Sequence, residues 1–246
     1  MKIFKCDLHI HSALSPCASL EMSPKNIVIN ARKAGLDIIA ITDHNMIENG
    51  FYAHELAKET GTAVLFGMEL QTREEIHLLI IFDNYETASS FHRRIYDLLP
   101  EVENDPSYFG DQVVVDCDDN IVRFENKLLL NSAQISLNDA VFLAKQMGAL
   151  VISSHIDSPN FSIISQLGYV PEDLPLDALE VRKKENIPHL LPFIMNKDIP
   201  FVTFSDAHYI DDIGKRITAL PLNEPNVVEI AKALKAMEKM VPSNDE

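Results

Sequence analysis

Short apolar runs separated by amphipathic segments recur along the whole chain. Several of these runs are continuously apolar rather than alternating, which is typical of strands that are covered on both faces. The runs that predict strands span residues 2–11, 36–42, 62–70, 76–82, 149–154, 178–181 and 200–205. Seven strands in a chain of 246 residues favour a parallel sheet closed into a barrel close to the TIM type.

The segments between the strands carry helix signals. Ser23 and Pro24 supply an N-cap and a proline at the first helical position, and Gly35 ends that helix. Ser136 begins a later helix, which Gly148 ends. This alternation of strands and helices predicts an α/β fold.

Residues 100–135 interrupt the alternation. Within them, 112–125 has the pattern of a β-hairpin around an acidic turn. We interpret 100–135 as an insertion into a single barrel domain that spans residues 1–246.

Composition and charge narrow the class of partner. The chain has 21 Lys and Arg against 37 Asp and Glu, a net charge of −16, which disfavours broad contact with a nucleic-acid backbone. We therefore expect nucleic acid to be an improbable partner. No apolar run reaches the length of about 18 residues that a membrane span needs. Three cysteines without a pairing pattern and no visible secretion signal favour a cytoplasmic location, and the sequence carries no signal for an oligomeric state.

Side chains that bind metals gather at the predicted strands. Asp7, His9 and His11 are spaced by two, which places them on one face of the first strand. The later strands carry further side chains of this kind: His44, Glu69, His77, His155, Asp206 and His208. Because the carboxyl ends of parallel strands meet at one mouth of a barrel, most of these side chains converge there.

His77 begins its strand, so a strictly parallel barrel would place it at the opposite mouth. Only seven residues separate it from Glu69. A tight or antiparallel pairing of 62–70 with 76–82 would bring His77 back beside Glu69.

Six motifs, in the order DLHIHS, TDHN, GMEL, EIHLL, SSHID and SDAH, resemble those of the PHP family, the polymerase and histidinol phosphatase domain. The resemblance covers residues 3 to about 215, with 100–135 outside it. It implies a distorted (β/α)7 TIM-like barrel with a small inserted hairpin. It also implies up to three divalent metal ions and the hydrolysis of phosphate esters.

The same resemblance implies which residues hold the metal ions. The sets are His9, His11, Glu69 and Asp206 for a first ion, Glu69, His77 and His155 for a second, and His44 with His208 for a third. In the loop that completes the third set, many family members have His or Asp, and this chain has Cys17. A thiolate suits Zn²⁺ or Fe²⁺, and Mn²⁺ also fits the imidazoles. Alternatively, the third site is weak and Cys17 is a small buried residue.

Other polar residues beside the motifs suggest supporting roles. Asp43 is a candidate general acid, or else it orients a ligand histidine. Asp7 is expected to support a ligand, and Asp157 to do so or to have no role. Arg182 and Lys183 follow the strand 178–181 and are candidates for binding phosphate oxygens.

These features favour a metal-dependent phosphoesterase that hydrolyses the phosphate ester of a small metabolite or nucleotide by metal-activated hydroxide. One alternative is an amidohydrolase-like enzyme, although such sites usually include a lysine after a middle strand, where this chain has Glu69. The other is a non-catalytic metal domain with a regulatory or nucleic-acid-associated role.

Overall fold

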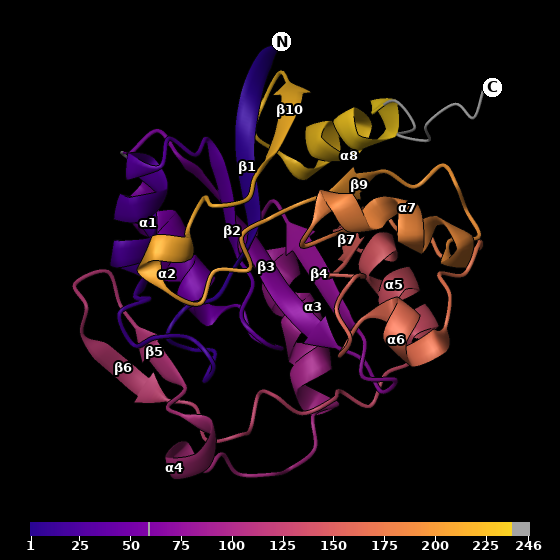
Figure 1. Cartoon of the computed structure of the whole chain (residues 1–246). Coiled ribbons are helices and arrows are strands. Elements are labelled where there is room, and N and C mark those ends of the chain that lie inside the picture. The colour runs from indigo at the N-terminus through magenta and orange to yellow at the C-terminus, as the bar shows by residue number, and fades with distance from the viewer. Residues whose placement is uncertain (59, 238–246) are drawn as a thin grey trace, which may run out of the picture.

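An eight-stranded sheet that is nearly closed into a barrel forms the centre of the molecule (Figure 1). The structure is a computed structural model and describes residues 1–58 and 60–237. In sheet order the strands are β10 (Thr218–Leu222), β1 (Lys2–Ile10), β2 (Ile38–Ile41), β3 (Ala63–Gln71), β4 (His77–Phe82), β7 (Leu150–Ser153), β8 (Ala178–Glu180) and β9 (Phe201–Val202). All seven predicted strands are present, and β10 is an addition that the pattern did not indicate.

The strand directions explain how the sheet closes. β1, β2 and β3 are parallel, as are β7, β8 and β9, while β4 runs antiparallel to both of its neighbours. A parallel bridge between Ile10 and Ala207 brings the chain after β9 onto β1. The predicted fold, a distorted TIM-like barrel, is confirmed. Of the pairings that would bring His77 beside Glu69, the structure has the antiparallel one between β3 and β4.

The helices lie around the barrel (Figure 1), and the two whose starts the sequence indicates begin there. They are α1 (Pro24–Lys33), α2 (Glu48–Ala57), α3 (Tyr85–Asp97), α4 (Pro106–Phe109), α5 (Leu137–Gln146), α6 (Ile163–Leu167), α7 (Ile187–Leu190) and α8 (Val227–Ala236). The side chains of Ser23 and Ser136 accept hydrogen bonds from backbone N–H groups in the first turns of α1 and α5, so both predicted N-caps are confirmed. Within the described residues, no helix is long and apolar enough to cross a bilayer.

One end of the barrel is apolar and the other is polar. Leu65 on β3 and Leu79 on β4 belong to a buried apolar cluster that also includes Ile230 of α8. Because alternate residues of a strand share a face, Glu69 and His77 point to the same side as these leucines. Glu69 follows Leu65 on β3, and His77 precedes Leu79 on the antiparallel β4, so both lie toward the same end of the barrel. The strands therefore place the polar residues at the mouth opposite to α8.

The insertion forms its own two-stranded sheet beside the barrel, from β5 (Val113–Val115) and β6 (Ile121–Phe124), so the predicted hairpin is present. Asn49 of α2 holds it, because its side-chain amide donates to the Val113 carbonyl and its carbonyl accepts from the Val115 N–H. The buried position of Asn49 makes this a fixed attachment. That residues 1–246 form a single domain stays a prediction.

Gly67 on β3 tests the packing between neighbouring strands. A Cβ atom at this position would lie 2.6 Å from Thr42 Cγ2 and 3.2 Å from the Ile41 carbonyl oxygen. We expect Gly67→Ala to lower the free energy of unfolding by about 1–3 kcal/mol, measured by urea unfolding. Gly50→Ala is the matched control, because a Cβ there meets nothing closer than 3.9 Å and alanine favours the helix. Equal stability of the two variants would contradict this account.

Candidate metal centre

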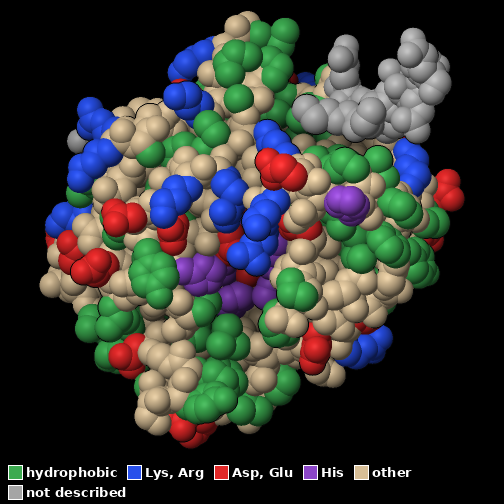
Figure 2. Space-filling view, viewed as in Figure 1, with side chains coloured by type: hydrophobic (Ala, Val, Ile, Leu, Met, Phe, Trp, Pro, Cys, Tyr) green, Lys and Arg blue, Asp and Glu red, His purple; other side chains and the backbone are tan. Residues whose placement is uncertain are grey.

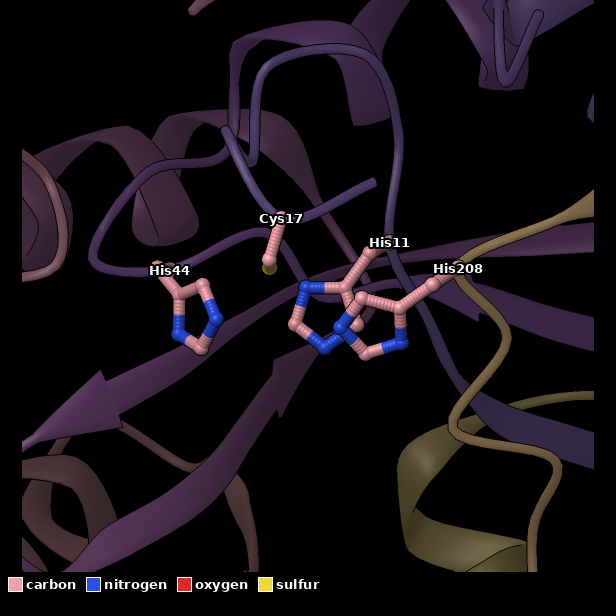
Figure 3. A group of neighbouring side chains, drawn as sticks. All are labelled: His11, Cys17, His44 and His208. Atoms are coloured by element: carbon pink, nitrogen blue, oxygen red, sulfur yellow. The ribbon is translucent and has the colours of Figure 1, made fainter. Parts of the chain in front are cut away.

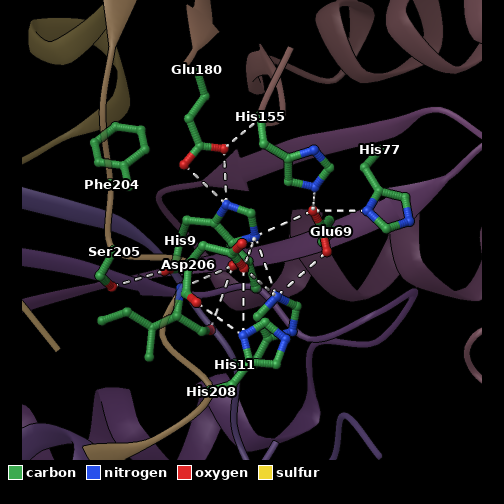
Figure 4. A network of polar contacts seen from close by, with 12 residues as sticks. His9, His11, Glu69, His77, His155, Glu180, Phe204, Ser205, Asp206 and His208 are labelled. Carbon is green, nitrogen blue, oxygen red and sulfur yellow. Dashed lines mark hydrogen bonds and ion pairs between the residues drawn. The ribbon is translucent and has the colours of Figure 1, made fainter. Parts of the chain in front are cut away.

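Glu69 is the hub of the polar mouth (Figure 4). Its side chain is almost fully buried. Oε1 lies 3.1 Å from His77 Nδ1, 3.2 Å from His9 Nε2 and 3.3 Å from His155 Nε2. Oε2 lies 3.2 Å from His44 Nδ1 and 3.4 Å from His11 Nε2. One carboxylate therefore faces five imidazoles, which come from β1, β4 and the segments after β2 and β7.

The segment after β9 adds a second carboxylate. Asp206 Oδ1 lies 3.4 Å from His9 Nε2 and 3.6 Å from both His11 Nε2 and His208 Nδ1. The structure thus brings together every residue that the sequence suggested as a metal ligand on β1, β3, β4 and at the later strand ends.

Cys17 belongs to a third group of neighbouring side chains (Figure 3). His11, Cys17, His44 and His208 each offer a ligand atom, and these atoms all lie within 4.8 Å of one another. Two further groups meet the same criterion, namely His9 with His11 and Asp206, and His44 with Glu69 and His77. The grouping differs in part from the sets that the resemblance implied, because His11 also approaches Cys17 and His44 also approaches Glu69. The assignment of each residue to an ion stays a prediction.

The donor atoms fit bound cations. Although Glu69 lies 3.1 Å from His77 Nδ1 and 3.2 Å from His44 Nδ1, Glu69 Oε1 and these two nitrogens are buried and form no hydrogen bond. A buried polar atom without a hydrogen bond costs about 1–3 kcal/mol, so these three neighbouring atoms call for a compensating group. A divalent ion that accepts nitrogen and oxygen ligands would satisfy them.

The charge states also suit a metal centre. Burial would raise the pKa of Glu69, but His77 and His9 outweigh it and hold this pKa well below the usual range. Burial, reinforced by His208, lowers the pKa of His11 to about 4, and burial also lowers the pKa of His44 far below normal. At neutral pH the site therefore offers an ionised Glu69 and neutral imidazoles at His11 and His44. Against the effect of burial, Glu180 raises the pKa of His9 and Glu69 raises the pKa of His155, so these two imidazoles would lose a proton on binding a metal ion.

Asp43 supports the centre from behind. It is fully buried, and its carboxylate accepts hydrogen bonds from the Ser12 N–H at 2.7 Å, the Ser12 hydroxyl at 2.5 Å and the Ser15 hydroxyl at 2.7 Å. Since Ser15 gives its proton to Asp43, it accepts from His11 Nδ1–H at 3.0 Å and leaves Nε2 free for a metal. Of the two roles that the sequence suggested for Asp43, the structure favours orientation of a histidine over general acid catalysis.

Asp7 and Asp157 accept hydrogen bonds from backbone N–H groups and, among the described residues, none from a ligand imidazole. Asp7 accepts from the backbone N–H groups of Ser205 at 2.9 Å and Gly214 at 3.0 Å, which fixes the segment that carries Asp206. Asp157 accepts from the N–H groups of Arg182 at 2.9 Å and Lys183 at 3.1 Å. Both basic side chains are exposed and outside the cavity, and neither forms an ion pair with a described residue.

Two residues of the centre were missed by sequence reasoning. Glu180 at the end of β8 accepts from His9 Nδ1 at 2.9 Å and from the His155 N–H at 3.0 Å. Gln71 lies 2.9 Å from His77 Nε2 through its Oε1. Both carry a signal that could have been used, because Glu180 ends a strand like the other site residues and Gln71 stands two residues after Glu69.

The site opens into a cavity of about 300 Å³. It is lined by Cys17, His44, Glu69, Gln71, His77, Leu130, His155, Phe161, Asp206 and His208. Figure 2 shows this His-lined hollow with Lys and Arg side chains along one edge and hydrophobic side chains along the opposite edge. The arrangement combines a polar floor that can hold cations with a partly apolar wall.

Glu180 tests the role of the residues behind the ligands. In Glu180→Gln an amide nitrogen replaces one of the two oxygens that lie 2.9 and 3.1 Å from His9 Nδ1, and His9 loses one of its carboxylate partners. We expect the affinity for Zn²⁺, measured by competition with a chelator, to fall about 10- to 100-fold. Glu185→Gln, on an exposed residue five positions later, is expected to leave the affinity unchanged. The same affinity in both variants would show that Glu180 does not orient His9.

Comparison with known proteins places the chain in a family. The model of the PHP domain matches residues 7–158, and the model described as PHP-associated matches residues 192–238. Uncharacterized protein MJ1587 of Methanocaldococcus jannaschii is 40% identical over 79 residues, which cover 28% of this chain and 46% of that protein.

Several solved structures share the fold. An endonuclease from Pyrococcus furiosus that is specific for DNA lesions, PfuEndoQ, has a TM-score of 0.71 at 18% identity and covers 96% of this chain. A two-domain protein from Bacteroides vulgatus, which contains a predicted PHP-like metal-dependent phosphoesterase, has a TM-score of 0.56 at 18% identity and covers 95%. This chain spans 56% and 63% of the length of these two proteins.

One expectation is corrected by these structures. Endonuclease Q has also been solved with a 27-mer duplex that carries an abasic lesion at the active site, with a TM-score of 0.64 and 18% identity over 96% of this chain and 57% of that one. The expectation that nucleic acid is an improbable partner is therefore wrong, because net charge describes the whole surface and the same fold serves a DNA-cleaving enzyme. Since the PHP domain model matches more than half of its residues, the chain belongs to the PHP domain family.

Proposed function

We propose that this protein is a metal-dependent phosphoesterase that hydrolyses a phosphate ester at the polar mouth of the barrel. One observation carries the proposal: Glu69 faces five imidazoles and lies with Asp206 in a cavity of about 300 Å³. Carboxylate and imidazole groups at these separations are the ligands of multinuclear hydrolytic centres. The membership in the PHP family supports the same conclusion.

The ligand residues would divide between two or three Zn²⁺, Mn²⁺ or Fe²⁺ ions. His9, His11 and Asp206 would hold one ion, and His77 and His155 a second, with Glu69 between them. His44, His208 and Cys17 would hold the third. When bound, such ions lower the pKa of coordinated water to about 7 and neutralise charge on the phosphoryl oxygens.

The chain's own residues would orient these ligands and the substrate. The hydrogen bonds that His11 donates to Ser15, His9 to Glu180 and His77 to Gln71 fix which imidazole nitrogen faces the cavity. Arg182 and Lys183 would bind phosphate oxygens outside the cavity, since both are exposed and follow the strand that carries Glu180.

The substrate could be a small phosphate ester or DNA, and an assay of both decides between them. The size of the cavity supports a terminal phosphate or a nucleotide extruded from a strand, because a duplex does not enter a space of about 300 Å³. The lining of the cavity disfavours the amidohydrolase-like alternative, since no lysine lines it among the described residues.

The first test removes the metal by chelation and then replaces Glu69. We expect the purified protein to contain two or three equivalents of transition metal by elemental analysis. It should release inorganic phosphate from at least one of a panel of aryl, sugar and nucleotide phosphates, or cleave a strand of lesion-bearing DNA. Chelation should abolish the hydrolysis, and added Zn²⁺, Mn²⁺ or Fe²⁺ should restore it. Glu69→Gln should lower the rate by about 100-fold or more, while Glu86→Gln on the surface should not. A fully metal-loaded protein that is inactive on the whole panel would favour the non-catalytic alternative.

The second test asks whether Cys17 is a ligand. In the cobalt-substituted protein we expect a thiolate-to-Co²⁺ charge-transfer band in the near ultraviolet, because Cys17 lies within 4.8 Å of the donor atoms of three histidines. The band should vanish in Cys17→Ser and persist in Cys117→Ser. Cys117 belongs to the insertion, and its sulfur lies near the Tyr52 carbonyl of α2. A band that survives in Cys17→Ser would exclude this thiol as its source.

A further inference from the structure

Phe161 forms one wall of the cavity. Its side chain offers no metal ligand, so the candidate metal centre does not explain its position. Its ring lies parallel to the His77 imidazole, with an interplanar angle of 6° and 4.9 Å between the ring centroids. Although His77 covers one face, Phe161 keeps 39% of its surface exposed and lines the cavity. An aromatic ring that is stacked on one side and open on the other offers a surface for a second flat ring.

The backbone holds this ring in place at an energetic cost. Phe161 has a φ of +56°, a left-handed conformation that costs a residue with a side chain about 1–3 kcal/mol. Its carbonyl accepts from the His77 N–H at 2.9 Å. The next residue, Ser162, caps α6 and donates to the Ser158 carbonyl at 2.7 Å. Contacts on both sides of the strained residue therefore fix the orientation of the wall.

Leu130 supplies a second apolar surface from the insertion. It is partly exposed and lines the same cavity. The residues on either side of it are tied to the barrel, because Asn45 Nδ2 donates to the Leu129 carbonyl at 2.8 Å and to the Asn131 carbonyl at 3.0 Å. Two separate segments thus add apolar side chains to a cavity whose floor is otherwise made of His, Glu and Asp.

We propose that Phe161 and Leu130 select a substrate whose flat ring, a nucleobase, stacks on Phe161 while its phosphate lies over the polar floor. The proposal rests on the phosphoesterase function and adds the class of substrate. A nucleobase supplies an aromatic face for Phe161 and an apolar edge for Leu130. The base can belong to a free nucleotide or to a nucleotide extruded from a nucleic-acid strand.

The chain contains no tryptophan, so Phe161→Trp places a single fluorophore in the wall and keeps an aromatic ring there. The probes are the phosphonate analogues of AMP and of ribose 5-phosphate, which share sugar and anion, resist hydrolysis and differ in the base. We expect the AMP analogue to quench the fluorescence of the metal-loaded variant at saturation and the ribose analogue not to do so. Phe142→Trp, on an exposed face of α5, is the control and should respond to neither.

The affinities of the wild-type protein and of Phe161→Leu for the two analogues give an independent measure. Phe161→Leu should weaken binding of the AMP analogue about tenfold and change binding of the ribose analogue less than about twofold. Equal losses for both analogues, or equal quenching by both, would overturn the proposal and leave Phe161 as support for His77. Quenching by a short single-stranded oligonucleotide but not by the AMP analogue would assign the base to a strand, and the reverse result would assign it to free nucleotides.

These experiments can distinguish failure of the nucleobase proposal from failure of the phosphoesterase proposal. If the AMP analogue binds as expected but no phosphate ester in the panel is hydrolysed, the nucleobase wall stands and the phosphoesterase function fails. If phosphate is released but neither probe distinguishes the base, the function stands and the nucleobase wall fails.

Discussion

The buried carboxylate of Glu69 is the constraint on which the rest of the molecule depends. Moving an ionised carboxylate out of water costs several kcal/mol unless charge and hydrogen bonds compensate for it. Five imidazoles provide part of that compensation, and they arrive from β1 and the residue after it, from β4, and from the segments after β2 and β7. Bound cations would provide the rest, because Glu69 Oε1 forms no hydrogen bond. Only the closed sheet brings these side chains together, so the candidate metal centre depends on closure of the barrel.

Sequence reasoning succeeded where a residue type and a strand end together carry the signal. His77 could be placed beside Glu69 because seven residues leave room only for a tight pairing of their strands, and the structure shows that pairing. Glu180 was missed because a glutamate in a short strand has no distinctive spacing, and only the fold brings it to His9. The adjacency of Asp43 to His44 suggested chemistry, whereas its contacts lie on the opposite side, with the loop that holds His11. Net charge was a poor guide to nucleic-acid binding for a related reason. It sums charges over the whole surface and does not describe the part around the cavity.

Strained backbone conformations are also concentrated at the candidate metal centre, and no sequence pattern predicts them. Among the residues that the structure describes, six other than glycine have positive φ, and four of them, Asn45, His155, Phe161 and Asp206, lie at the cavity or next to its ligands. Each such conformation costs about 1–3 kcal/mol and persists only where neighbouring contacts determine it. The polar mouth is thus preorganised, because the chain accepts local strain to aim these side chains.

The insertion is part of this preorganisation rather than an independent appendage. Gln71 contacts His77 Nε2 through its Oε1 and donates through its Nε2 to the Ser132 hydroxyl at 2.8 Å. The N–H of Gln71 in turn donates to Asn45 Oδ1 at 3.0 Å, and Asn45 also holds the backbone around Leu130. A displacement of the insertion would therefore reach the imidazole of His77 through two side-chain amides. The barrel supplies the ligands, and the insertion takes part in orienting one of them while shaping the wall that a substrate meets.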